Sequence, residues 1–136
     1  EEYSWKDLFD AETCIRCGRC VAVCPAFMTD KPLLPRDVIQ SLRDHLDEKA
    51  KLSVDANGRI SLIPEEDYKG PALIGNVVDK DTVWACTTCM ACIEACPAYI
   101  SQFPKLIDLR RYLSMMESDF PAEVQDVFKG MENNAN

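Results

Sequence analysis

The sequence predicts a mostly α-helical single domain that covers residues 1–136. Apolar residues recur at helical spacing in several segments, and prolines stand where helices would begin, at Pro35, Pro104 and Pro121. The same cysteine motif also occurs twice, at residues 14–25 and 86–97. We therefore expect antiparallel helices arranged around two short cysteine loops.

The first expected element is a short helix that begins after Ser4. Ser4 can cap this helix because Asp7 follows three residues later, which is the spacing of a capping box. Trp5, Leu8 and Phe9 give the helix an apolar face. The helix leads directly into the first cysteine motif.

Within the first motif, Gly18 suits a tight turn in which backbone amides approach a ligand closely. The segment from Arg19 to Cys24 is expected to form one or two helical turns. Pro25 should end them, since the residue before a proline is biased away from the helical conformation.

Residues 25–85 lie between the last cysteine of the first motif and the first cysteine of the second. Pro35 suits the first position of a helix, which should continue to about Ala50. Apolar residues follow at helical spacing, at Val38, Ile39, Leu42 and Leu46.

Residues 52–78 are expected to form an irregular spacer. Asn57-Gly58 lies between two short alternating runs, residues 52–54 and 60–62, which predicts a small β-hairpin. Prolines and glycines then mark an irregular stretch, at Pro64, Gly70, Pro71 and Gly75.

Asp81 is expected to cap a short segment that brings Trp84 against the second motif. After that motif, Pro104 should open a helix whose apolar residues are available for burial: Leu106, Ile107, Leu113 and Met116. Pro121 should open a last helix with apolar residues at helical spacing, at Val124, Val127, Phe128 and Met131.

The two motifs contain every cysteine of the chain, and each ends in Cys-Pro. Their spacing is that of the bacterial ferredoxin run, which binds [4Fe-4S] clusters. In two-cluster ferredoxins the fourth cysteine of each run ligates the other cluster. Applied here, cluster 1 is held by Cys14, Cys17, Cys20 and Cys96. Cluster 2 is held by Cys86, Cys89, Cys92 and Cys24.

Three alternatives to iron-sulfur clusters fit the sequence less well. Structural zinc sites usually join two separate Cys-x2-Cys pairs, and tetrahedral zinc does not call for three thiols in one curl. Disulfides would suit a small secreted chain, but cysteines two residues apart in repeated blocks are poor crosslinks and no signal peptide is visible. Chance placement of buried thiols does not explain two identical spacings.

Composition limits the partners. The formal net charge is -8, which argues against nucleic acid. No apolar run is long enough to span a bilayer, and no basic block would hold the chain on anionic lipid. We expect no direct membrane insertion and a cytoplasmic location, at the face of the membrane only through a parent chain. The start at Glu1 and the polar end suggest a piece of a longer polypeptide, with processing of a natural terminus as the alternative.

Two motifs separated by a helical spacer resemble the α-helical ferredoxin fold of the iron-sulfur subunits of heterodisulfide reductase, succinate dehydrogenase and fumarate reductase. The chain is most similar to heterodisulfide reductase-related iron-sulfur proteins. These include electron-transfer-flavoprotein:quinone oxidoreductase-like proteins and the iron-sulfur subunits of glycolate oxidase and anaerobic glycerol-3-phosphate dehydrogenase. The resemblance is carried by residues 84–89 (Trp-Ala-Cys-Thr-Thr-Cys), 17–20 (Cys-Gly-Arg-Cys) and 107–113 (Ile-Asp-Leu-Arg-Arg-Tyr-Leu).

This resemblance implies an electron-transfer module that relays single electrons through two clusters. The donor would be a flavoprotein dehydrogenase or an electron-transfer flavoprotein, and the acceptor a CCG-domain, disulfide-reducing or quinone-linked partner. CCG domains and transmembrane helices, which full-length members often carry, do not occur in this sequence. The alternatives are a structural or redox-sensing cluster domain and a separate heterodisulfide reductase C-type subunit.

No catalytic residue is expected in this chain. His45 lies on an expected surface helix, and no glycine-rich nucleotide motif occurs. Arg16 and Arg19 are expected to offset local negative charge, with raising a cluster's potential or docking an acidic partner as the alternatives. Lys105, Arg110 and Arg111 are expected to form a solvated helix face. Trp84 and Phe27 are expected to pack around the clusters.

Overall fold

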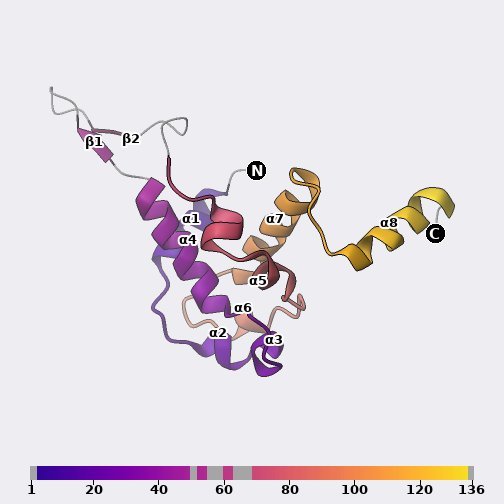
Figure 1. Cartoon of the computed structure of the whole chain (residues 1–136). Coiled ribbons are helices and arrows are strands. Elements are labelled where there is room, and N and C mark those ends of the chain that lie inside the picture. Colours follow the sequence, from indigo (N-terminus) through magenta and orange to yellow (C-terminus); the bar gives the residue numbers. More distant parts are fainter. Residues whose placement is uncertain (1–2, 50–51, 55–59, 63–68, 135–136) are drawn as a thin grey trace.

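Helices form most of the chain in a computed structural model that describes residues 3–49, 52–54, 60–62 and 69–134 (Figure 1). The predicted mostly helical fold class is confirmed. In chain order the elements are α1 (Trp5–Glu12), α2 (Arg19–Ala22), α3 (Pro25–Met28), α4 (Pro35–Lys49), β1 (Leu52–Val54), β2 (Ile60–Leu62), η2 (Leu73–Val77), α5 (Lys80–Trp84), α6 (Ala91–Glu94), α7 (Gln102–Met115) and α8 (Ala122–Asn134).

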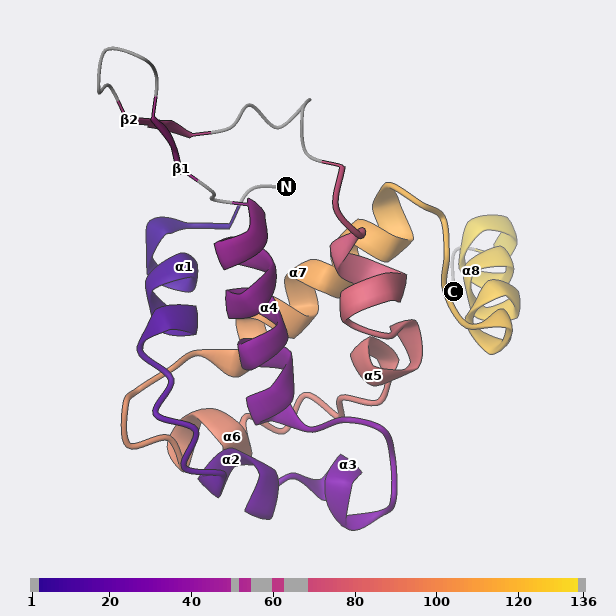
Figure 2. The ribbon, with the colours of Figure 1, turned by 60° about the vertical axis from the view of Figure 1, so that its left-hand side comes forward.

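Helix α4 is the central element and has the predicted start at Pro35. It buries Val38, Ile39 and Leu42 and contacts α1, α2 and η2. In Figure 2, α1 and α5 lie on opposite sides of α4, while the short helices α2, α3 and α6 gather near its first turn. The two cysteine loops therefore lie at the same end of the molecule.

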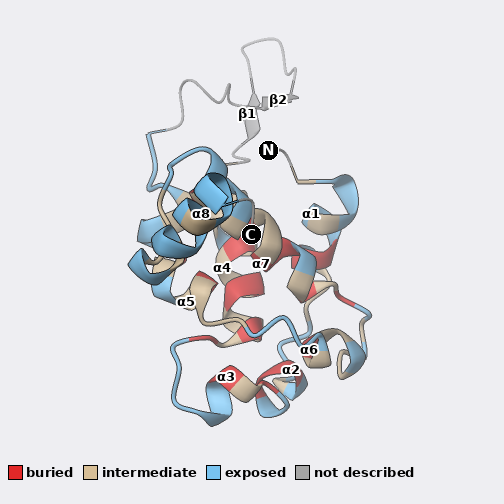
Figure 3. Cartoon of the chain, turned by 90° about the vertical axis from the view of Figure 1, so that its right-hand side faces the viewer, coloured by how far each residue is buried: buried red, intermediate tan, exposed pale blue. Residues whose placement is uncertain are grey.

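The main core lies between α4, α5 and α7, where Figure 3 shows the buried residues between the helices. Its most completely buried apolar side chains come from all three helices and the adjoining loops: Leu33, Ile39, Val83, Ile100, Leu106 and Leu113. Burial of this apolar surface is the main force that fixes α7 against α4. One predicted core residue, Met116, is instead 69% exposed, because it lies just past the end of α7.

Helix α1 has the predicted capping box. The Ser4 hydroxyl accepts a hydrogen bond from the Asp7 amide, and the Asp7 carboxylate accepts one from the Ser4 amide. Its apolar face, however, is turned to solvent, with Trp5 79% and Phe9 60% exposed. The face that docks contains Asp10, because a buried cation of α7 attracts it.

The predicted hairpin is present as the antiparallel pair β1 and β2, with Leu52 opposite Leu62 and Val54 opposite Ile60. The Asn57-Gly58 turn and Pro64 lie outside the described residues. Gly70 and Pro71 belong to no helix or strand. Gly75 interrupts η2 with a φ of 92°, which glycine adopts without steric cost.

The helical turn predicted from Arg19 is present as α2 and ends before Pro25, where Cys24 has extended backbone. Pro25 then begins α3, because the first helical position needs no N–H donor. Two other predicted helix boundaries were wrong. Asp79 occupies the N-cap of α5, so Asp81 lies inside its first turn. Helix α7 begins two residues before Pro104, which is tolerated because first-turn amides have no acceptor within the helix.

Helix α8 follows Pro121 as predicted but projects away from the rest of the molecule (Figure 1). None of its described residues is buried. Phe128 contacts the ring of Phe120 edge-on, with 5.0 Å between ring centroids. Within the described ranges, no helix is both long enough and apolar enough to cross a membrane.

Candidate functional site

The two cysteine loops follow the same backbone path. Arg16 and Thr88, each between the first two cysteines of its motif, have φ values of 56° and 59°. Gly18 and Met90, the next matching pair, have φ values of 79° and 62°. Left-handed backbone is costly for residues other than glycine. The repetition of left-handed residues at matching positions indicates that the same structural constraint shapes both loops.

Each curl borders a hollow that receives a cysteine from the opposite motif. The first hollow is lined by Cys14, Cys17, Cys20 and Cys96. The second hollow is lined by Cys24, Cys86, Cys89 and Cys92. The structure thus groups the thiols in the two sets of four that the sequence suggested. Ligation by these sets stays a prediction.

The donor sets fit a multi-iron cluster. Within the described part of the chain, no three or more His, Cys, Asp or Glu side chains converge so as to hold a single metal ion. Zinc would require sulfurs about 2.3 Å from one point. Four thiols around the edge of a hollow instead match a [4Fe-4S] cluster with four cysteine ligands.

The thiols are crowded. Burial and the neighbouring Cys14 and Cys96 thiolates raise the pKa of Cys20. Burial and the Cys86 thiolate raise the pKa of Cys92 to about 11. Metal ligation requires thiolates, so bound iron has to overcome this repulsion, and its binding releases protons.

The two hollows adjoin each other through α2 and α6. Cys20, from the first motif, packs with Val21 and with Cys92, from the second motif, in one buried cluster. The Cys20 charge also contributes to the raised pKa of Cys92, after burial and Cys86. The sites are therefore close enough to interact electrostatically.

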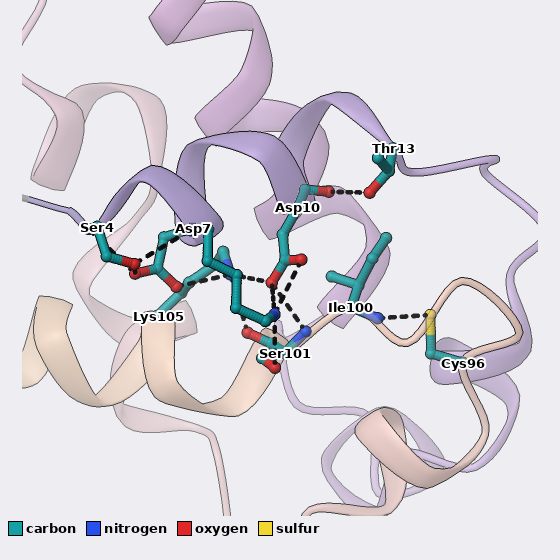
Figure 4. Close-up of polar contacts among 9 residues, drawn as sticks. Ser4, Asp7, Asp10, Thr13, Cys96, Ile100, Ser101 and Lys105 are labelled. Carbon is teal, nitrogen blue, oxygen red and sulfur yellow. Dashed lines mark hydrogen bonds and ion pairs between the residues drawn. The ribbon is translucent and has the colours of Figure 1, made fainter.

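A buried ion-pair network lies between α1 and the chain that follows Cys96 (Figure 4). The ammonium of Lys105, 1% exposed, donates to Asp7 at 3.0 Å, to Asp10 at 2.8 Å and to the carbonyl of Ser101 at 3.1 Å. The Ser101 amide donates to Asp10 at 3.1 Å. The network joins α1, which precedes Cys14, to the start of α7, which follows Cys96.

The hydrogen bonds of this network stabilise the ionised forms of its two carboxylates. Burial alone would raise the pKa of Asp7 and of Asp10. The hydrogen bonds to Asp7 from Ser4 and Lys105 outweigh this and lower its pKa. Those to Asp10 from Lys105, Lys6 and the Ser101 amide do the same. Both carboxylates are therefore ionised at neutral pH opposite one buried ammonium.

Arg110 fixes the chain that enters the second loop. Its guanidinium donates to the carbonyls of Val83 at 3.0 Å, Trp84 at 3.1 Å and Cys86 at 2.5 Å. It also lies 5.3 Å from the centroid of the Trp84 ring, a distance typical of a cation–π contact. The C-terminal carbonyls of α5 thereby gain a partner.

The prediction that Lys105 and Arg110 lie on a solvated helix face was therefore wrong, while Arg111 is exposed as expected. Sequence reasoning also missed Gln102, which is 3% exposed and lines the first hollow. In the orientation that satisfies its partners, its amide nitrogen donates to the carbonyls of Ile100 at 2.6 Å and Cys92 at 3.3 Å. Gln102 thus lines the hollow of the first loop while it donates to a carbonyl of the second motif.

The remaining candidates have mixed positions. Arg16 lines the first hollow, whereas Arg19 is exposed and does not. Trp84 packs against the main core, but Phe27 is 44% exposed. His45, half-buried on α4, lines neither hollow, and burial and then Lys49 lower its pKa.

Comparison with known proteins gave a family and several relatives. The family described as 4Fe-4S dicluster domain matches residues 6–97. The chain is 40% identical over 148 residues to an EtfAB:quinone oxidoreductase of Syntrophomonas wolfei, covering 100% of the chain and 21% of that protein. It is 32% identical over 140 residues to a probable membrane-anchored ferredoxin of Chromohalobacter salexigens, covering 96% of the chain and 20% of that protein.

A third relative is one of the subunits of the dihydromethanophenazine:CoB–CoM heterodisulfide reductase of Methanosarcina barkeri. It is 33% identical over 97 residues, which cover 69% of the chain and 22% of that protein. The chain thus spans about a fifth of the length of these curated relatives. No solved structure matches the chain.

Proposed function

The chain belongs to the family of 4Fe-4S dicluster domains, and from this premise we propose that it is a two-cluster electron relay. Its cofactors are two [4Fe-4S] clusters, in keeping with the family and with eight cysteines. One observation carries the proposal: two hollows, each lined by four cysteines, adjoin through Cys20 and Cys92. A cluster in each hollow would place two one-electron carriers side by side.

The proposed ligands are divided between the motifs. Cys14, Cys17, Cys20 and Cys96 would hold cluster 1. Cys24, Cys86, Cys89 and Cys92 would hold cluster 2. The ion pairs of Lys105 support this division for cluster 1, because they bring the chain beyond Cys96 against α1.

A cluster bound by four cysteines would supply one-electron transfer and would leave no iron coordination position open for a substrate. The protein residues position and shield the clusters. Cys20, Val21 and Cys92 exclude water between the hollows. Arg110 holds the Cys86 carbonyl, and Gln102 holds the Cys92 carbonyl. We propose no catalytic side chain in this domain.

We further propose that the donor is a flavoprotein and the acceptor a quinone- or disulfide-reducing partner. The names of two relatives support this, since one is an EtfAB:quinone oxidoreductase and the other belongs to a heterodisulfide reductase. A membrane-anchored ferredoxin among the relatives supports membrane association of a parent protein. The chain itself would act at the cytoplasmic face.

The test is cofactor analysis followed by reversible reduction, both without oxygen. We expect about eight iron and eight acid-labile sulfide per chain, following from two four-iron sites. Both clusters should accept an electron from dithionite and return it to an oxidant while the far-ultraviolet circular dichroism stays unchanged. Zinc without sulfide would reject the cluster sites. Clusters that cannot be reduced while the fold persists would favour the purely structural role.

A further inference from the structure

Cationic side chains line the first hollow but not the second, where Arg110 contacts the Cys86 carbonyl without lining the hollow. Arg16, from the ligand loop, and Arg36, from the first turn of α4, both line the first hollow. Among the described residues that line the second hollow, none is charged. Its side chains other than the cysteines are mostly apolar: Leu33, Pro35, Met90, Phe103 and Leu106, with Thr87.

Arg36 is held so that its guanidinium faces the first cysteine loop. Its Nε donates to Asp37 at 2.6 Å. Its Nη1 lies 3.9 Å from the point that a Cβ would occupy on Gly18, between two of the cysteines. Asp37 orients the arginine and offsets part of its charge, but Asp37 does not line the hollow, whereas Arg36 does. Arginine stays charged at any working pH.

Arg110, which donates to the Cys86 carbonyl from outside the second hollow, acts in the opposite direction. Hydrogen bonding to the thiols matches between the two sets, and burial acts in the same direction as the arginines. Each set of thiols accepts one amide hydrogen bond at 3.4 Å, from Ile100 to Cys96 and from Thr88 to Cys86. The first set has one buried cysteine, whereas the second has two, Cys24 and Cys92. Burial penalises the more negative, reduced cluster and so lowers its potential.

We infer that the cluster held by the first hollow has the higher reduction potential. When the domain carries a single electron, that electron is on this cluster. This rests on the proposed function and adds the order of reduction. Each step transfers one electron from a chemical reductant to one cluster. The added negative charge is stabilised by nearby Arg36 and Arg16 in the first hollow, but by no charged lining residue described in the second.

The experiment is an anaerobic redox titration of the chain with both clusters, followed by electron paramagnetic resonance. Wild-type protein is expected to reduce in two separate steps. Arg36→Gln should lower the upper step and leave the lower step in place, whereas Arg36→Lys should restore the upper step. Arg43→Gln is the matched control, because Arg43 lies on the same helix, pairs with Glu12 and Asp47, and lines neither hollow. It should shift neither step.

A second set of variants exchanges the residues at matching positions of the two cysteine motifs. Arg16 and Thr88 occupy matching positions with φ values of 56° and 59°. Thr88→Arg should therefore add no backbone strain, whereas Arg16→Thr places a β-branched side chain on left-handed backbone. Arg16→Thr should lower the upper step. Thr88→Arg should raise the lower step and narrow the gap between them.

A single reduction step in the wild-type protein would overturn the inference. So would an upper step whose potential changes in neither Arg36→Gln nor Arg16→Thr. A shift of the lower step in Arg36→Gln, or an equal shift of both steps, would also overturn it. Iron and sulfide content separates this failure from that of the proposed function. Variants that contain both clusters, but whose reduction steps do not shift, would reject only the order of reduction. Wild-type protein without eight iron rejects the relay itself.

Discussion

The first cysteine loop is reached through α1, which buried ion pairs fix to α7, whereas the second is reached through α5, which one arginine fixes through main-chain carbonyls. The loops themselves have the same left-handed positions and are followed by four-residue helices, α2 and α6. The same thiol geometry is thus supported by two different kinds of contact. Loss of either support should damage one half more than the other.

The largest expected effect tests whether the halves share their ligands. Cys24→Ser and Cys96→Ser should each remove one cluster, reducing iron from about eight to about four per chain. If Cys24 serves the second cluster, adding Cys89→Ser to Cys24→Ser should remove no further iron. Adding Cys17→Ser to Cys24→Ser should remove the remaining cluster as well.

Iron and sulfide analysis of these single and double variants, reconstituted without oxygen, makes the measurement. The reverse pattern, in which Cys17→Ser adds nothing to Cys24→Ser but Cys89→Ser does, would show two local sites. Each half of the molecule would then bind its cluster independently of the other.

The next effect concerns the ion pairs of the first half. Lys105→Met should lower the free energy of unfolding by about 3–5 kcal/mol, because it leaves the buried Asp10 carboxylate without its main partner. Cluster 1 should be lost before cluster 2. Anaerobic denaturation followed by circular dichroism and cluster absorbance measures both.

Lys6→Met is the matched control, because Lys6 also contacts Asp10, at 2.9 Å, but its side chain is 50% exposed. It should cost no more than about 1 kcal/mol. Equal costs for the two lysines would mean that burial at Lys105 does not matter.

A smaller effect is expected in the second half. Arg110→Met should lower the free energy of unfolding by about 1–3 kcal/mol, because three carbonyls lose a charged donor. The loss stays moderate because α5 is partly exposed, so water can hydrogen-bond to these carbonyls instead. Cluster 2 should become the more labile one, as measured by the order of bleaching during denaturation.

The control is Arg111→Met, because Arg111 is the exposed neighbour of Arg110 and pairs with Asp108 at 3.3 Å. It should change stability by less than about 1 kcal/mol. Preferential loss of cluster 1 in Arg110→Met would contradict the division of support between the halves.

The smallest effect compares Gly18 with Met90. Gly18→Ala should destabilise by about 1 kcal/mol, because it places a Cβ on left-handed backbone. Met90→Gly should relieve that strain but loosen the unfolded chain, so its net change should stay below about 1 kcal/mol. Denaturation midpoints of the two variants measure the difference, and a large loss in Met90→Gly would assign the Met90 side chain a packing role at the second hollow.

Local sequence determined much of this molecule. The Ser4 capping box, the start of α4 at Pro35 and the pairing of β1 with β2 all depend on residues close together in the chain. The cysteine spacing likewise determined the chemistry, because three thiols at intervals of two residues, followed by Cys-Pro, suit a cluster and little else.

Boundaries near prolines were less predictable. Pro25 begins a helix and Pro104 lies within the first turn of one, and both places tolerate a missing N–H. The sequence cannot choose between them and a helix end, because that choice depends on where the flanking chain must go.

The tertiary structure alone decided which face of α1 is buried and which cations lie at the first hollow. Trp5 and Phe9 face solvent because Lys105, far along the chain, draws Asp7 and Asp10 inward. Arg36 belongs to the first hollow only because α4 folds back over the loop that precedes it. These contacts join residues distant in sequence, and an unpaired buried charge costs more than an exposed aromatic ring, so long-range pairing overrode the local apolar pattern.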